Sequence, residues 1–281
     1  MGFTINTNIP SLNAQRNTSA TQLSLSTSLQ RLSSGLRVNS AKDDAAGLAI
    51  AERMNAQVRG MSVAIRNAND GISMAQTAEG GLQTMTDMIQ RMRELAVQAV
   101  NSTNTSADVD ALNQEYTQLR GELSRTISAV QFNGTNLFTG SANFDFQVGA
   151  NSGQTITISA ADLNVNTATD MVAITTGATG SALTTSANSA NAANIDLLDK
   201  ALLTINSTRA KLGAVQSRFD NTVNFLRTAV ENQSAARGRI MDADFAVETA
   251  NLSRSQILQQ AGTAMIAQAN QLPQGVLALL R

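Results

Sequence analysis

The sequence predicts a mostly α-helical protein: an elongated rod of long antiparallel helices, packed as a coiled-coil-like bundle, with a small β-hairpin region at the end remote from the termini. From Val58 to Ile89, apolar residues recur at alternating spacings of three and four, as in helices packed lengthwise. The predicted helix, Asp44 to about Asn101, would be roughly 85 Å long. The same spacing recurs from Ile195 to Gln233. Only 3% of residues are aromatic although 42% are hydrophobic, which suits a thin helical bundle.

Weaker helical patterns lie near both ends of the chain. The first covers residues 5 to 36 and is interrupted by Arg16 and Ser19, and the last is interrupted by Asn251 and Arg254. Pro273 is expected to halt the last helix. We expect the terminal helices to pair as a second bundle that only other molecules complete, which indicates a subunit of a polymer.

The apolar positions of these two helices are the predicted polymerisation residues. They are Ile5, Ile9, Leu12, Leu25, Leu29, Leu32 and Leu36 in the first, and Leu258, Met265, Leu272, Val276, Leu277 and Leu280 in the last segment.

Several local signals divide the rest of the chain. Ser40 and Asp43 form a predicted capping box that opens the long helix. A third helix is expected from Val109 to Val130. Period-two segments at 144–148 and 155–158 predict a β-hairpin. Residues 175–194 are rich in Thr, Ser, Ala, Asn and Gly, so we expect a surface loop there, with Asn194 as the N-cap of the helix that follows.

Three domains follow from this plan. Residues 1–43 with 238–281 form a terminal helical polymerisation domain, and residues 44–140 with 190–237 form a rod-shaped helical core domain. Residues 141–189 form a β-hairpin and a variable segment. Glycines within the long helix cost about 1 kcal/mol each relative to Ala, so they indicate close backbone approach or compensating packing.

The composition argues against an enzyme. Without His or Cys there is no Ser-His dyad, thiol nucleophile or HExxH zinc site, and no cofactor or metal is expected. Asp43 and Asp44 are interpreted as charges at a helix start. The methionines at 85, 88 and 92 are interpreted as a core stripe in preference to a binding surface. The net charge of −1 does not indicate a nucleic-acid partner, no apolar run is long enough for membrane insertion, and the N-terminus lacks the pattern of a cleaved signal peptide.

Four stretches carry a family resemblance. Residues 30–54, which include Arg-Leu-Ser-Ser-Gly-Leu-Arg-Val-Asn-Ser-Ala-Lys-Asp-Asp-Ala-Ala-Gly, resemble the N-terminal signature of bacterial flagellin. Residues 66–73, 90–98 and 257–281 are similar to further flagellin segments. The resemblance covers roughly residues 1–140 and 190–281, so the central variable region is reduced.

The resemblance implies a structural protein that self-assembles into the extracellular filament of the bacterial flagellum for motility. It implies export through the flagellar type III channel without a cleaved signal peptide. The implied partners are copies of the chain itself, an export chaperone, filament cap and hook-junction proteins, and host Toll-like receptor 5. The alternative is a coiled-coil adaptor or junction protein of the flagellar appendage that does not polymerise indefinitely.

The resemblance also implies receptor-binding residues. These are Gln90, Arg91, Glu94, Leu95 and Glu115. From the pattern alone, Arg91 and Leu95 share one helix face, and Leu95 also continues the methionine stripe, so burial in the core is the competing interpretation for Leu95.

Overall fold

The computed structural model describes residues 7–176, 182–184 and 188–279. It divides into two compact units: unit 1 comprises Met1–Ala56 with Glu231–Arg281, and unit 2 comprises Gln57–Val230. The division falls within the two longest helices, α2 (Ala45–Ala99) and α6 (Asn188–Met241). The sequence predicted domain boundaries at 43/44 and 237/238 and a separate domain for residues 141–189. In the structure, residues 141–189 belong to unit 2.

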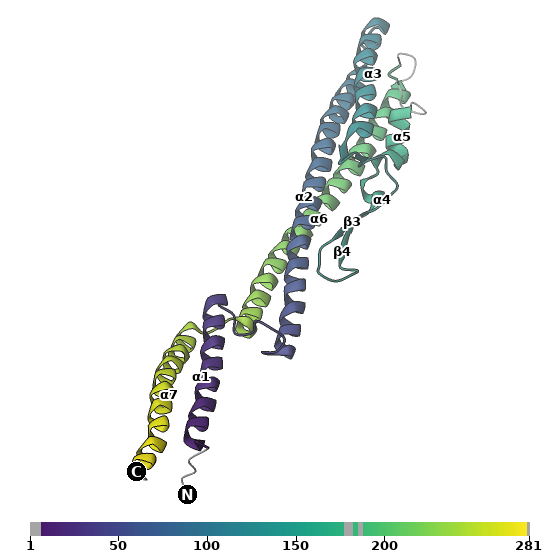
Figure 1. Ribbon diagram of the computed structural model, residues 1–281. Helices are drawn as coiled ribbons and strands as arrows, with labels where there is room; N and C mark the ends of the chain where they lie inside the picture. Colours follow the sequence, from purple (N-terminus) through teal and green to yellow (C-terminus); the bar gives the residue numbers. More distant parts are fainter. Residues whose placement is uncertain (1–6, 177–181, 185–187, 280–281) are drawn as a thin grey trace. The chain divides into compact units, whose positions relative to one another are not determined.

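Unit 1 is built on two antiparallel helices, α1 (Ile9–Ser34) and α7 (Phe245–Leu279), which lie side by side in Figure 1. The expected pairing of the terminal helices is therefore confirmed. Gly35 ends α1 in the left-handed region, with a φ of 70°, and donates its N–H to the Arg31 carbonyl. A small apolar cluster of Val38, Ala51 and Met241 completes the unit.

Helix α7 does not end at Pro273, as the sequence predicted, but continues to Leu279. Proline lacks the N–H that would bond the carbonyl four residues earlier, that of Ala269. That carbonyl instead accepts a hydrogen bond of 2.8 Å from Nδ2 of Asn8. An outside donor thus offsets part of the cost of proline within the helix.

The predicted capping box at Ser40 is also wrong. Asp43 Oδ2 accepts bonds of 2.9 Å from both the backbone N–H and the hydroxyl of Ser40, but these residues form a turn that precedes the helix. Helix α2 begins at Ala45, and Asp44 Oδ1 accepts the Gly47 N–H at 2.7 Å. Asp44 is therefore the residue that caps α2.

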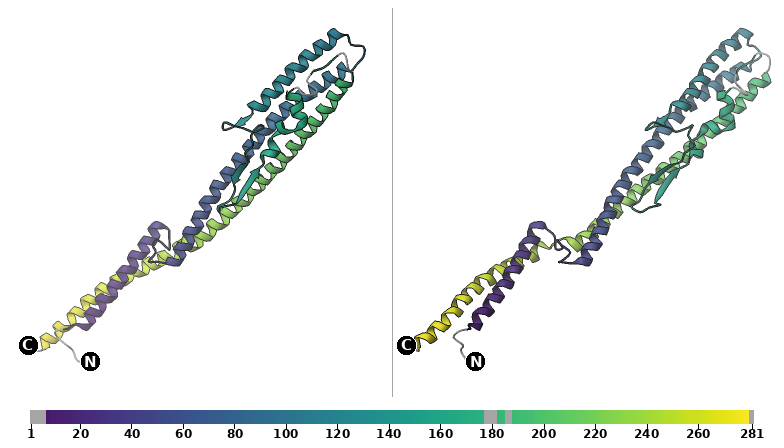
Figure 2. Two further views of the ribbon diagram at one scale, coloured as in Figure 1. Left: turned by 90° about the vertical axis from the view of Figure 1, so that its right-hand side faces the viewer. Right: turned by 45° about the vertical axis from the view of Figure 1, so that its right-hand side comes forward.

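Unit 2 packs α2 against α6 and against α3 (Ser106–Ala129), both antiparallel to it. Arg91 of α2 reaches Glu115 of α3, and Arg93 of α2 reaches Asp199 of α6. Figure 2 shows α3 running back along α2 from two further sides. The predicted spacing is confirmed, since its positions from Ala68 to Ile89 supply several fully buried core residues, and so is the methionine core stripe. The buried core residues of this part of α2, which include the methionines at 85, 88 and 92, are Ala68, Ala75, Leu82, Met85, Met88, Ile89 and Met92.

Two β-hairpins belong to unit 2. The predicted one pairs β3 (Phe144–Gln147) with β4 (Thr155–Ile158) in antiparallel register. It lies beside the early part of α2 in this unit, where Asn67 Nδ2 donates to the Gln147 carbonyl at 3.0 Å, and not at the turn between α2 and α3.

The second hairpin was not predicted. It joins β1 (Gln131–Phe132) to β2 (Thr135–Asn136) through Asn133 and Gly134, both at positive φ, where the sequence suggested only a helix stop.

Two glycines of α2 allow close approach by other side chains. A Cβ on Gly71 would lie 2.6 Å from Cζ of Phe219, and one on Gly60 would lie 3.0 Å from Cβ of Ala150. Phe219 in turn meets Phe146 of β3 edge to face, with ring centroids 5.5 Å apart. Close approach therefore explains these two glycines.

The surface loop expected at 175–194 is wrong over the residues described. Three short helices, α4 (Ala160–Leu163), η1 (Val165–Thr167) and α5 (Thr169–Thr176), precede α6, which begins at Asn188. Leu183 is buried, as are the side chains of Asn191 and Asn194.

Amide side chains explain this ordering. Asn191 exchanges two hydrogen bonds with the backbone of Thr184, at 3.0 and 2.9 Å, and Asn194 donates to the Ala182 carbonyl at 3.2 Å. Asn194 thus lies inside α6 and is not its N-cap. No helix in the described ranges is long and apolar enough to cross a membrane.

Candidate self-association surface

Helices α1 and α7 bury polar and small residues between them. Ser11 and Ser28 are the two buried residues of α1. Across from them, Glu248, Ser255 and Ala269 of α7 are each 7% exposed. We call these five residues the polar seam. Since apolar burial is the main favourable contribution to folding, the seam alone stabilises the pair weakly.

Many of the large apolar residues of the same helices are exposed instead. On α1, Leu12 and Leu23 are 53% and 73% exposed, and on α7, Leu258 and Met265 are 51% and 58% exposed. We call this set the outer apolar surface; it comprises Ile9, Leu12, Leu23, Leu29, Phe245, Val247, Ile257, Leu258 and Met265. Several exposed large apolar side chains on one helix pair are typical of an interaction surface.

At 3.6 residues per turn, part of this surface forms two stripes. Ile9, Leu12 and Leu23 fall within about 60° of one another around α1. Val247, Leu258 and Met265 fall within about 20° around α7. On α1 the stripe lies roughly 100° or more from Ser11 and Ser28, whereas on α7 the stripe borders the seam, since Ala269 is only about 20 to 40° from it. Both stripes are exposed, so another chain can cover them.

The structure leaves five of the predicted polymerisation residues exposed on this surface. Ile9, Leu12, Leu29, Leu258 and Met265 are exposed. Leu25, Leu32 and Leu36 are half-buried. The remaining predictions fall outside the described residues or side chains: Ile5, Leu272, Val276, Leu277 and Leu280.

Sequence reasoning missed four exposed residues of the outer apolar surface. They are Leu23, Phe245, Val247 and Ile257. Helical spacing alone could have identified Leu23, which lies within about 60° of Ile9 and Leu12, and Val247, which is in phase with Leu258 and Met265.

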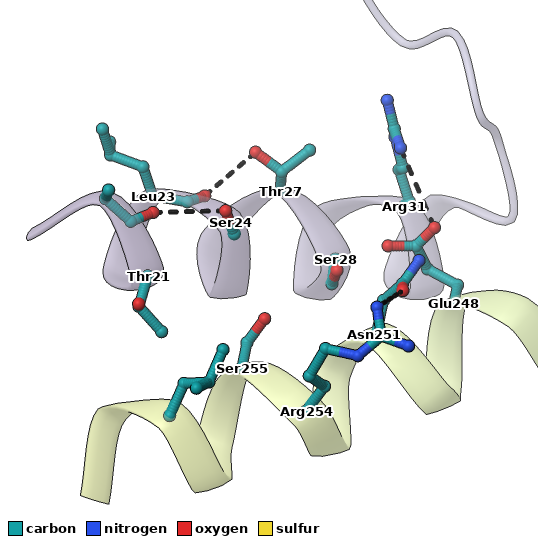
Figure 3. Close-up of a pocket in the computed structure, with 12 residues that line it drawn as sticks. Thr21, Leu23, Ser24, Thr27, Ser28, Arg31, Glu248, Asn251, Arg254 and Ser255 are labelled. Atoms are coloured by element: carbon teal, nitrogen blue, oxygen red, sulfur yellow. Dashed lines mark hydrogen bonds and ion pairs between the residues drawn. The ribbon is translucent and has the colours of Figure 1, made fainter. Parts of the chain in front are cut away.

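A groove of about 560 Å³ runs between α1 and α7 (Figure 3). Leu23 and Leu258 of the outer apolar surface contribute to it. Arg31 and Glu248 point toward one another, with Nη1 and Oε2 3.8 Å apart. The other lining side chains are mostly short or polar: Ala20, Thr21, Ser24, Thr27, Ser28, Asn251, Arg254 and Ser255. Short side chains let a further helix approach closely, and the groove holds no histidine or cysteine for acid–base or thiol chemistry.

The predicted receptor residues lie in unit 2, and the structure brings four of them to the surface. Arg91 Nε bonds Glu115 Oε1 at 2.8 Å, and its Nη1 bonds Glu94 Oε2 at 2.9 Å. These two bonds, that to Glu115 foremost, raise the pKa of the Arg91 guanidinium. Gln90 is exposed beside them. The four form a compact charged and polar patch across α2 and α3.

Leu95 does not belong to that patch. It is 1% exposed and packs in the main core of unit 2 with the methionine stripe. Lying seven residues after Met88, it returns to nearly the same face of α2, which is turned inward. Its expected role as an exposed anchor is therefore wrong.

The geometry thus defines a helical type of chain whose two ends pair and leave apolar residues uncovered. The family model for the bacterial flagellin N-terminal helical region matches residues 5–143, and that for the C-terminal helical region matches residues 195–280. The chain belongs to the bacterial flagellin family.

Individual relatives agree with this assignment. A flagellin of Halalkalibacterium halodurans is 46% identical over 278 residues, covering 99% of each chain. A flagellin of Xenorhabdus nematophila is 44% identical over 313 residues, covering 100% of each. The crystal structure of Bacillus cereus flagellin is 30% identical, with a TM-score of 0.50, over 61% of this chain and 94% of that one.

Family membership gives the chain a structural role as a subunit of the flagellar filament. Flagellins polymerise with copies of themselves, and the filament lies outside the cell. The short length of this chain fits a reduced variable region.

Proposed function

We propose that this flagellin polymerises through the outer apolar surface of α1 and α7. The observation that carries the proposal is the inversion in unit 1: serines and a glutamate are buried between the helices while leucines and a methionine face outward. Each of these apolar side chains contributes about 1 kcal/mol or more when a neighbouring copy covers it. Repeated over many contacts, that gain offsets the weak pairing within one chain.

Charge substitution on the two stripes tests this proposal. Leu12→Asp and Leu258→Asp should each raise the critical concentration for polymerisation at least tenfold, because a buried, unpaired carboxylate costs several kcal/mol. Asn17→Asp is the matched control, since Asn17 is exposed on α1 but lies off the Ile9, Leu12 and Leu23 stripe. Light scattering and electron microscopy of purified chain measure the outcome.

Normal filaments from both leucine variants would contradict the proposal. The same images separate the filament subunit from the junction adaptor, because an adaptor forms short assemblies of fixed size at every protein concentration and a filament subunit elongates.

We further propose export through the flagellar type III channel and, during export, a chaperone on α7. The exposed Ile257, Leu258 and Met265 offer an apolar helix face of the kind that a groove-shaped partner covers. Filament cap and hook-junction proteins would then meet the same terminal helices at the filament ends. Leu258→Asp should abolish chaperone binding in calorimetry while Asn17→Asp leaves it unchanged.

A second proposed activity is binding to host Toll-like receptor 5 through Gln90, Arg91, Glu94 and Glu115. What favours it is the patch itself, in which an exposed Arg is held between two carboxylates across two rigid helices. Arg is enriched among the residues that dominate binding energy at interfaces.

Arg91→Ala should weaken receptor binding by about 1 to 3 kcal/mol. The exposed ion pairs contribute little to folding, so the stability of unit 2 should change by less than about 1 kcal/mol. Arg125→Ala is the matched control, because Arg125 forms a similarly exposed ion pair with Glu122 of α3. Equal receptor affinity for wild type and Arg91→Ala, measured on folded monomer, would remove this proposal.

A further inference from the structure

Helix α7 contains a backbone carbonyl that its own helix leaves without the usual donor. In an α-helix the carbonyl of residue 269 bonds the N–H of residue 273. Residue 273 is proline and has no N–H, yet α7 runs on to Leu279. Ala269 is buried in the polar seam, so water has little access to replace the missing donor.

Asn8 supplies a donor from the other end of the chain. Its Nδ2 lies 2.8 Å from the Ala269 carbonyl oxygen. The same side chain is the N-cap of α1, because its Oδ1 accepts the Ser11 N–H at 3.3 Å. One amide thus satisfies an orphan N–H of α1 and an orphan carbonyl of α7.

A second contact reinforces this position. Ser11, 4% exposed, donates its hydroxyl to Oδ1 of Asn270 at 2.8 Å. Toward the other end of the α1–α7 pair, Arg31 and Glu248 form an ion pair of 3.8 Å, which is longer than the 2.8 Å bonds of Asn8 and Ser11. Serine and alanine are small along the rest of the seam, so polar contacts at defined residues contribute to the axial register.

We propose that Asn8 is the positioning residue that fixes α1 against α7, and that Pro273 serves to free the Ala269 carbonyl for it. A slip of one helical turn would displace α1 by about 5.4 Å and separate its apolar stripe from that of α7. The register therefore decides which composite surface another copy meets. Only this consequence rests on the proposed polymerisation; the register itself does not.

A double-mutant cycle isolates the contact. Asn8→Ser keeps an N-cap of equal quality but is too short to reach the carbonyl. Pro273→Ala restores the N–H that the carbonyl lacks. Asn8→Ser should therefore loosen the pair when residue 273 is proline and have little effect when it is alanine. Asn17→Ser, at an exposed position of α1, is the matched control.

An introduced disulfide gives the readout. The chain has no cysteine, so Thr18→Cys with Gly262→Cys creates a unique pair. A Cβ on Gly262 would lie 3.5 Å from that of Thr18, within the range of natural disulfides. The equilibrium with glutathione, measured on unassembled full-length chain, gives the effective concentration of one thiol at the other.

We expect Asn8→Ser to lower this effective concentration about tenfold in the Pro273 background, equivalent to about 1.4 kcal/mol, as for an unsatisfied buried carbonyl. In the Pro273→Ala background the fall should be less than about twofold. Equal falls in both backgrounds, or none in the Pro273 background, would overturn the assignment. If the two introduced thiols show no measurable effective concentration in the chain that retains Pro273, the pairing of α1 with α7 is itself wrong.

Polymerisation gives the second measurement. Asn8→Ser should raise the critical concentration about tenfold, and Pro273→Ala should remove most of that increase. A failure to polymerise in every background, with the thiol cycle as expected, would count against the proposed polymerisation and leave the register contact intact.

Discussion

Units 1 and 2 differ in which side chains they bury and which they expose to solvent. Unit 2 buries methionines, leucines and aromatic rings along α2, α3 and α6, although Leu203 and Phe225 are exposed. In unit 1, α1 and α7 bury serines, a glutamate and an alanine, and they expose Leu12, Leu23, Leu29 and Leu258. The difference indicates that unit 2 carries the stability of the isolated chain, whereas unit 1 acquires most of its apolar burial from other copies.

Two phenylalanines on one helix give the largest expected contrast. Phe219 of α6 is fully buried against Gly71 and Phe146, while Phe225 is 70% exposed. Phe219→Ala should lower the free energy of unfolding by about 3 to 5 kcal/mol. Phe225→Ala should change it by about 0.5 kcal/mol or less. Urea unfolding followed through Tyr116, the single tyrosine and buried in unit 2, measures both; similar losses would remove the distinction between core and surface on α6.

Peroxide oxidation compares the two units in one experiment. Met265 is 58% exposed on α7, whereas Met74, Met85 and Met92 are buried in unit 2. Susceptibility to oxidation follows exposure, so Met265 should form sulfoxide at least about tenfold faster than those three. Peptide mass mapping gives the rates. In assembled filaments Met265 should be protected from oxidation, and filaments of Asn17→Asp serve as a control. Equal oxidation rates for Met265 in the subunit and in the filament would show that Met265 lies outside the contact between copies.

The sequence predicted the long helices well and the contacts of individual polar side chains poorly. Asp44 to Asn101 was close to the observed Ala45–Ala99 because repeated apolar spacing is averaged over many residues. The order at 182–184 depends on two side chains, Asn191 and Asn194, that bond backbone groups 7 and 12 residues earlier in the chain, and helical or strand periodicity does not reveal such bonds.

The candidate surface was predictable in part for the same reason. Helical spacing identified Leu12, Leu258 and Met265 as members of apolar stripes, but not which side of each helix faces its partner. Leu95 shows the limit in unit 2, since its place beside Arg91 suggested a surface anchor while its phase with Met88 put it in the core. Continuation past Pro273 required Asn8, 265 positions away, to supply a donor.

A pH titration separates the unit 2 core from its surface. Burial raises the pKa of Tyr116 to about 12, from a usual value of 10. Because the folded pKa is raised, the neutral phenol contributes stability that is fully present below pH 10 and is lost as pH rises toward 12. Absorbance of the phenolate should therefore stay low until the pH nears 12 or the unit unfolds. Ionisation near pH 10 in a chain that remains helical would show that Tyr116 is accessible to solvent.

The smallest expected effect concerns the N-terminus of α3, where Thr105 and Asp108 form a reciprocal capping box. Hydrogen bonds from the hydroxyl and backbone N–H of Thr105 hold the pKa of the Asp108 carboxyl below its usual range. Since the folded pKa is depressed, the stabilising contribution is present above the unfolded value of 3.8 and is lost as pH falls through the folded value. Asp108→Asn should slightly destabilise unit 2 at pH 7 and have less effect at pH 2, because the contribution of the ionised carboxyl declines as the pH falls below 3.8. Asp110→Asn, in the same turn but outside the capping box, is the control, and thermal melting at the two pH values measures both variants. A destabilisation by Asp108→Asn that is equal at pH 2 and pH 7 would show that the charge of Asp108 does not support the cap.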